Sequence, residues 1–113
     1  MSVPDRDLNI LRHMIGYCDQ IEEAIALFGR NYSVFQANTV YQNAVAMCLM
    51  QIGELSGHLT EEFKTAYPQQ PWRQIKALRN LIAHHYGAVD VETAWEIVEN
   101  DIPALRSFCE TLI

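Results

Sequence analysis

Eight consecutive residues, 79–86, bring a cation, an amide, two imidazoles and a phenol together in the order Arg-Asn-Leu-Ile-Ala-His-His-Tyr. Cleavage of RNA through the neighbouring 2′-hydroxyl needs a base for that proton, an acid for the leaving oxygen and a cation beside the phosphate. Histidine exchanges protons near neutral pH, and arginine stays charged and can bind two phosphate oxygens at once. Arg79 and His84 could therefore support this reaction without a metal ion.

The spacing within the octet complicates a simple catalytic pair. An α-helix turns about 100 degrees per residue, so Arg79 and His84 would lie roughly 140 degrees apart on a regular helix. Tyr86 returns to the side of Arg79, while Asn80 and His84 are neighbours four residues apart. The pair could meet if the arginine reached around the helix, if the last turn distorted near Gly87, or if a second subunit completed the cleft. Alternatively, the histidines only stabilise the helix C-terminus.

The net charge of −6 counts against a broad nucleic-acid surface, because phosphate binding normally draws on clustered Lys and Arg. Three of the eight basic residues nevertheless stand at steps of three: Arg73, Lys76 and Arg79. This spacing keeps them on adjoining turns of one helix sector, which predicts a local positive strip on an acidic protein. The alternative is an ordinary solvated helix face.

Four amphipathic segments are expected to position the octet. The first begins near Pro4 and ends at Gly29, a usual helix stop, and the second begins near Ser33, whose spacing to Gln36 resembles a capping box. An apolar seam in each turns toward a partner helix, which predicts a long antiparallel pair. The first seam is Leu11, Met14, Cys18, Ile21, Ile25 and Phe28, and the second is Ala37, Tyr41, Ala44, Cys48, Ile52, Leu55 and Leu59.

The second half of the chain predicts two further helices. Thr60 could cap a short helical turn near 60–67, Pro71 would start a third helix that ends at Gly87, and Asp90 can cap a fourth. Pro103 interrupts the fourth helix and is expected to kink it. The inward positions are Trp72, Ile75, Leu78 and Ile82 in the third helix, and Val91, Trp95, Val98, Ile102, Leu105, Cys109 and Leu112 in the fourth.

Residues 1–113 therefore predict a single all-α domain, an up-and-down four-helix bundle with short connections. The longest apolar stretches fall below the roughly 20 residues that a spanning helix needs, and charged residues occupy 5–7, where a signal peptide would be apolar. We expect a cytoplasmic protein. Three cysteines at distant positions, Cys18, Cys48 and Cys109, favour reduced thiols in the core over disulfides or a zinc site, and no metal or cofactor is expected.

The octet resembles the Arg-Asn-x-x-x-His-x-Tyr signature of HEPN proteins, specifically the HepT type of toxin, and every defined position matches. The resemblance continues through Gln51-Ile52-Gly53-Glu54, Pro71-Trp72 and the segment from Trp95 to Leu105, so it covers most of the chain. It implies a homodimer whose two signature helices meet across a groove, where RNA is bound and cut without a metal ion. The toxin would belong to a type II-like toxin-antitoxin system.

The resemblance also implies roles for individual residues. Arg79 and His84 become the catalytic pair, and Asn80 would orient His84. Tyr86 corresponds to the tyrosine that the cognate nucleotidyltransferase antitoxin modifies with AMP. Glu54 could position Arg79 across the bundle or could simply be an exposed carboxylate.

Two alternatives to a toxin ribonuclease stay open. The first is a non-catalytic helical subunit that binds nucleotide or acts as the scaffold of a nucleotidyltransferase complex, and the second is a helical dimerisation protein with an incidental motif. The intact signature favours the ribonuclease, with Arg73 and Lys76 as supporting cations, whereas the acidic net charge favours the first alternative. Trp72 and Trp95 fit core or dimer-interface anchors better than base-stacking platforms.

Overall fold

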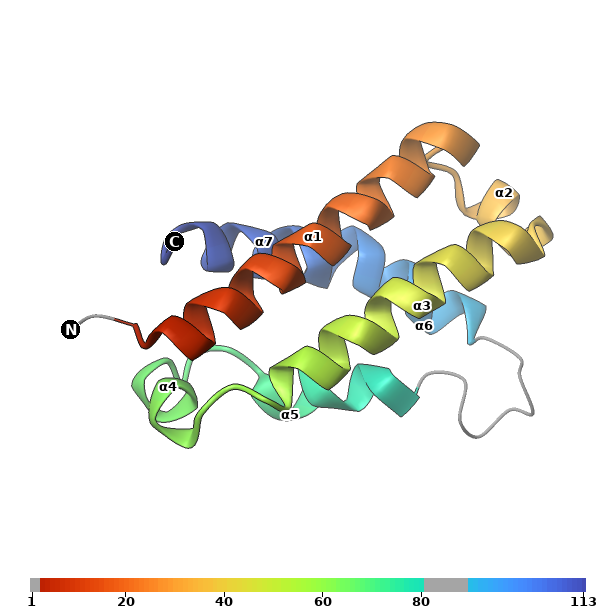
Figure 1. Cartoon of the computed structure of the whole chain (residues 1–113). Helices are drawn as coiled ribbons and strands as arrows, with labels where there is room; N and C mark the ends of the chain where they lie inside the picture. Colours follow the sequence, from red (N-terminus) through yellow and green to blue (C-terminus); the bar gives the residue numbers. More distant parts are fainter. Residues whose placement is uncertain (1–2, 81–89) are drawn as a thin grey trace.

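The computed structural model describes residues 3–80 and 90–113, and every regular element in those ranges is a helix. Two long antiparallel helices, α1 and α3, lie side by side, with the shorter elements packed around them (Figure 1). The helical bundle predicted from the sequence is therefore confirmed. The elements are α1 (Asp5–Phe28), α2 (Tyr32–Ala37), α3 (Thr39–Ser56), α4 (Glu61–Ala66), α5 (Trp72–Ala77), the 3-10 turn η1 (Leu78–Asn80), α6 (Val91–Glu96), the π-helical segment η2 (Ile97–Asp101) and α7 (Ile102–Glu110).

The apolar seam predicted for α1 is confirmed, because five of its six residues are buried and Phe28 is half-buried. The helix ends at Gly29, whose φ of 109° favours a residue without a side chain. The hydroxyl of Tyr41 donates a hydrogen bond of 2.9 Å to the Gly29 carbonyl, and the Tyr41 ring stacks on Phe28. The end of α1 is thus held against α3.

The sequence predicts one continuous second helix, and this prediction is wrong, because the helix is interrupted at Asn38. The side chain of Asn31 accepts a hydrogen bond from the amide of Val34 and starts α2, and Asn38 accepts from Tyr41 and starts α3. Asparagine caps satisfy amides that the first helical turn leaves unpaired, so each residue begins a new helix. The predicted capping box at Ser33 does not start the helix.

This break also changes which residues of the second seam are inside. Ala37 and Ala44 are exposed, whereas Val45 and Leu49 are fully buried. Helix α3 packs against α1 on one side and against α5 and η1 on the other, so its buried face is wider than one seam. The predicted apolar seam covers one face of a helix, so it could not indicate that α3, with neighbours on two sides, buries a second face as well.

Both caps predicted for the second half of the chain are confirmed. Thr60 accepts a hydrogen bond of 3.1 Å from the amide of Phe63 at the start of α4, and Asp90 accepts one from Thr93 at the start of α6. The fully buried carboxylate of Asp7 accepts hydrogen bonds from both the amide and the hydroxyl of Thr60, at 2.9 and 2.8 Å. Helix α1 is thereby joined to the start of α4.

The C-terminal helix changes its winding just before Pro103. The amide of Ile102 donates to the carbonyl of Ile97, five residues back, which is the π-helical spacing. Pro103 has no amide hydrogen and cannot close the next α-helical turn, so a disturbance at this point is expected, and the predicted irregularity is confirmed. Just before this segment, the ring of Trp95 in α6 packs against Phe35 of α2.

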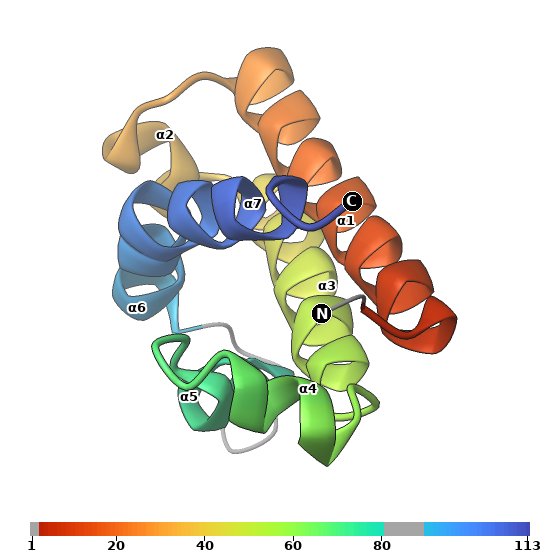
Figure 2. The same cartoon turned by 90° about the vertical axis from the view of Figure 1, so that its left-hand side faces the viewer.

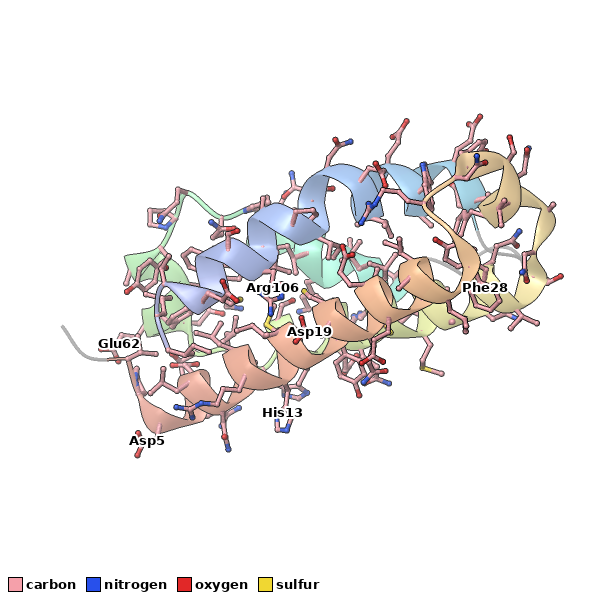
Figure 3. All side chains as sticks on the ribbon, turned by 90° about the horizontal axis from the view of Figure 1, so that it is seen from above. Asp5, His13, Asp19, Phe28, Glu62 and Arg106 are labelled. Carbon is pink, nitrogen blue, oxygen red and sulfur yellow. The ribbon has the colours of Figure 1, made fainter. Side chains whose placement is uncertain are left out.

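Ion pairs join α7 and η2 to α1. Arg106 donates to Asp19 across the two helices at 2.7 Å, and Figure 3 shows these two side chains facing each other. Arg30, just after α1, pairs with Glu22 at 3.0 Å and with Glu99 of η2 at 2.8 Å. Such exposed pairs contribute about 0–1 kcal/mol each, so the apolar interface provides most of the stability.

Candidate functional site

Arg79 and Asn80 lie at the end of the short α5–η1 arm, and both are exposed. Among the described residues, the third predicted helix is α-helical from Trp72 to Ala77 and then tightens into the 3-10 turn Leu78–Asn80. The assumption of 100 degrees per residue therefore fails at Arg79, since a 3-10 helix has three residues per turn. The rest of the predicted signature, including His84 and Tyr86, lies outside the described residues.

Gly53 sets the distance between this arm and α3. A β-carbon at Gly53 would lie 2.7 Å from the backbone nitrogen of Arg79, 3.0 Å from the carbonyl oxygen of Ile75 and 3.1 Å from that of Lys76. These are backbone atoms and cannot turn aside as a flexible side chain can. Gly53 therefore allows α5 and η1 to sit directly on α3, and it fixes where the backbone of Arg79 lies.

Sequence reasoning missed this role of Gly53, which it used only as part of the family resemblance. The available signal is a glycine inside a helix, where it costs roughly 1 kcal/mol relative to alanine unless the space is needed. Gly16 is also inside a helix but has nothing within 4 Å of its missing β-carbon. The two glycines cannot be told apart from the sequence.

Three cations line the α5–η1 arm. Arg73, Lys76 and Arg79 are all exposed, and the ε-carbon of Lys76 passes 3.5 Å from the position of a β-carbon on Gly57 of the segment after α3. The structure thus brings the predicted basic residues together on one short arm. This strip can bind a phosphate backbone, since Lys and Arg that neutralise phosphates release the counterions condensed on the nucleic acid.

Glu54 lies on α3 near this arm, and its side chain is exposed. Its Oε1 atom is 3.8 Å from Nε2 of His58, four residues later. Within residues 3–80 and 90–113, no ion pair joins Glu54 to Arg79. The geometry therefore presents Glu54 as an exposed carboxylate beside an imidazole.

Two adjoining hollows run along the other side of α5, between it and the C-terminal helix. The first has a volume of about 420 Å³, and its walls include Ile75 and Leu105. The second has a volume of about 320 Å³ and reaches Asn80. Both hollows are lined by Gln74, Leu78 and Ile97, so we treat them as one α5–α7 groove. In Figure 2, α5 and α7 lie apart at different heights of the bundle, with α6 at one end.

The two tryptophans have structural roles, as predicted. Trp72 is half-buried, donates a hydrogen bond of 3.0 Å to the carbonyl of Tyr67, and packs against Phe63 and Phe108. This cluster anchors the start of α5 to α4 and α7. The α5–η1 arm is thus held at its first residue by aromatic packing and at its end by the contact with Gly53.

The three cysteines occupy core positions, as predicted, and are poor nucleophiles. Burial raises the pKa of Cys18 and of Cys109 from 9.0 to about 12, and it also raises the pKa of Cys48. A protonated thiol attacks slowly, so these groups do not provide the reactive centre. In the described ranges, no three His, Cys, Asp or Glu side chains converge as metal ligands would, and no helix is long and apolar enough to cross a membrane.

Comparison with known proteins now places the chain. Residues 14–112 match the family described as "Ribonuclease HepT-like". A protein named "Probable ribonuclease HepT" from Thermococcus cleftensis is 37% identical over 101 residues, covering 85% of this chain and 92% of that protein. One named "Putative RNase MJ1216" from Methanocaldococcus jannaschii is 30% identical over 114 residues, covering 98% and 91% of the two chains. No solved structure matches significantly. The protein belongs to the HepT-like ribonuclease family.

Proposed function

We propose that this protein is a metal-independent endoribonuclease and the toxin of a type II-like toxin-antitoxin system. The observation that carries the proposal is the placement of Arg79 and Asn80, exposed on a short arm that Gly53 holds directly against α3. Membership of the HepT-like family supports RNA as the substrate. An exposed arginine with a fixed backbone suits a group that must bind a phosphate in one orientation.

The proposed reaction is an internal attack on the RNA phosphate. His84 accepts the proton of the 2′-hydroxyl, whose oxygen forms a bond to phosphorus while the bond to the 5′-oxygen breaks. The leaving 5′-oxygen takes a proton from the protonated imidazole of a second His84, supplied by the other copy of the chain. Arg79 stabilises the extra negative charge on the phosphate oxygens, and Asn80 orients His84. The products are a 2′,3′-cyclic phosphate and a free 5′-hydroxyl, and no metal ion enters the balance.

A homodimer completes the proposed site. One copy of the signature supplies a single His84, whereas the reaction needs both a base and an acid. A two-fold axis would bring the signature of a second copy, with its own His84, next to the first. The expected result is a dimeric mass in light scattering at working concentrations. A monomer that still cleaves RNA would show that one chain is sufficient.

Substitution of the proposed catalytic pair tests the chemistry. Arg79→Ala and His84→Ala should each lower the cleavage rate by about 10²-fold or more while the helix content stays unchanged. Arg12→Ala and His13→Ala are matched controls, because both residues are exposed on α1, and Figure 3 shows His13 pointing away from the bundle. Cleavage should persist in a chelator. Activity that disappears with EDTA and returns with a divalent ion would contradict the mechanism.

We propose that a nucleotidyltransferase antitoxin controls the toxin by attaching AMP to Tyr86. The attached phosphate would give Arg79 a tethered anion at an effective concentration of roughly millimolar or above, and the adenosine would block RNA. Co-expression with a candidate nucleotidyltransferase antitoxin should add an adenylate mass to the wild-type protein and none to Tyr86→Phe. A Phe variant that is modified and silenced equally well would refute this control.

The net charge of −6 is the observation that favours a second function, a non-catalytic nucleotide-binding or scaffold subunit of a nucleotidyltransferase complex. The same variants separate the two functions. A scaffold should bind the nucleotidyltransferase equally well with or without Arg79 and His84, and it should leave RNA intact.

A further inference from the structure

The α5–α7 groove has a chemistry that differs from that of the basic strip on the same arm. Its walls are aliphatic, with Ile75, Leu78 and Leu105 from both sides of the groove. The polar side chains on its lining, all in the described part of the chain, are amides, carboxylates and one hydroxyl, with no Lys or Arg. A phosphate would find no cation there and would be repelled by the carboxylates of Asp90 and Asp101.

The groove nevertheless lies next to a cation. Arg79 stands between Leu78 and Asn80 in η1, and both of these neighbours line the second hollow. The second hollow thus reaches the residues on both sides of the proposed catalytic arginine. An RNA whose phosphate binds at Arg79 can therefore place a neighbouring base in the groove.

From this juxtaposition we propose that the α5–α7 groove binds one unpaired base of the RNA substrate and selects bases that carry an exocyclic amino group. The proposal rests on the proposed ribonuclease function. A nucleobase is flat and uncharged, its faces suit aliphatic walls, and its edge offers donors and acceptors to amides and carboxylates. The volume of about 420 Å³ for the first hollow is within the range of small-molecule sites.

Asp101 determines which bases fit. A carboxylate accepts hydrogen bonds, so it pairs better with the amino group of adenine, cytosine or guanine than with the edge of uracil, whose single N3–H donor stands between two carbonyl oxygens. Gln74 can both donate and accept, so it tolerates either edge. Asp101 is the last residue of the π-helical segment η2, and such segments are frequent at functional sites. The expected order is therefore amino-bearing bases before uracil.

Binding can be measured without cleavage. Fluorescent single-stranded RNAs of about six identical nucleotides, fully 2′-O-methylated, cannot be cut through the neighbouring hydroxyl, and fluorescence anisotropy with the whole protein gives their dissociation constants. We expect the adenosine and cytidine oligomers to bind about tenfold more tightly than the uridine oligomer, a difference of about 1.4 kcal/mol. Equal affinities for the three oligomers would overturn the proposal.

Two variants and one control locate the effect. Asp101→Asn can donate as well as accept, so it should reduce the preference for amino-bearing bases to less than about threefold. Ala104→Leu places extra bulk in the first hollow and should weaken the adenosine and cytidine oligomers by about tenfold, whereas Ser107→Leu, exposed one turn later and outside the groove, should not. Thermal unfolding confirms that each variant is folded.

The outcomes also separate this proposal from the ribonuclease itself. Arg79→Ala should abolish cleavage and retain the base preference in the binding assay. A protein that cleaves RNA without any base preference overturns the groove proposal alone, whereas base-selective binding without cleavage overturns the ribonuclease alone. If Ala104→Leu changed the oligomeric state and left RNA binding unchanged, the groove would belong to a protein partner, and the proposal would be wrong.

Discussion

Gly53 and Gly16 should respond in opposite ways to the same substitution. Both glycines lie inside long helices, so replacement by alanine removes the same backbone penalty, worth roughly 1 kcal/mol. Around Gly16 there is nothing within 4 Å of the new β-carbon. Gly16→Ala should therefore stabilise the protein by about 0.5–1 kcal/mol, a rise of a few degrees in Tm.

The new β-carbon in Gly53→Ala meets three backbone atoms, the closest being the nitrogen of Arg79 at 2.7 Å. Because ordinary contacts begin near 3.4 Å, the α5–η1 arm must move away by several tenths of an ångström. Overpacking of this kind costs about 1–3 kcal/mol, which outweighs the roughly 1 kcal/mol gained from helix propensity. We expect a net loss of about 0–2 kcal/mol.

The larger effect of Gly53→Ala should appear in the cleavage rate. A displacement of about 1 Å in a group that positions the substrate can cost on the order of 10²-fold in rate, and a smaller shift costs proportionally less. We expect a fall of roughly tenfold or more in kcat, measured on a fluorescent RNA at saturating concentration, with helix content unchanged. Gly16→Ala should retain the wild-type rate.

Urea denaturation gives the free energy of unfolding of both variants, and the cleavage assay gives their rates. The reasoning would be refuted if Gly53→Ala were as stable as Gly16→Ala and also cleaved RNA at the wild-type rate. The close approach of α3 to the backbone of Arg79 would then not position the site.

Three further predictions concern the core. Asp7→Asn weakens the two hydrogen bonds from Thr60 to a fully buried side chain and should lower the free energy of unfolding by about 1–3 kcal/mol in urea, whereas an unchanged midpoint would show that water replaces them. Tyr41→Phe should cost about 1 kcal/mol in the same assay through the lost hydrogen bond at the end of α1. Because the pKa of Cys18 and Cys109 rises from 9.0 to about 12 on folding, the unfolded chain releases these protons first, so stability should be complete below pH 9 and should fall toward pH 12. Replacing both thiols with alanine should flatten that part of the pH profile, and an unaltered slope would assign it to other groups.

Local chemistry explains what could be predicted from the sequence. The α1 seam, the caps at Thr60 and Asp90 and the irregularity before Pro103 depend on residues within a few positions of one another, and all are confirmed. The cation, amide and imidazoles of the octet were identified by their types and spacing alone. Family membership also followed from this local pattern, and the comparison confirms it.

Contacts between distant segments decided the rest. Asn38 breaks a helix whose seam reads as continuous, because a capping side chain competes with the helical turn and only the packing of α2 and α3 shows which prevails. The burial of Val45 and Leu49 depends on α3 having neighbours on two sides. Gly53 and Gly16 are alike in the sequence, and they differ only because one faces the backbone of Arg79 and the other faces open space. The α5–α7 groove likewise joins segments about 30 residues apart, so its volume and the position of Asp101 exist only in the folded chain.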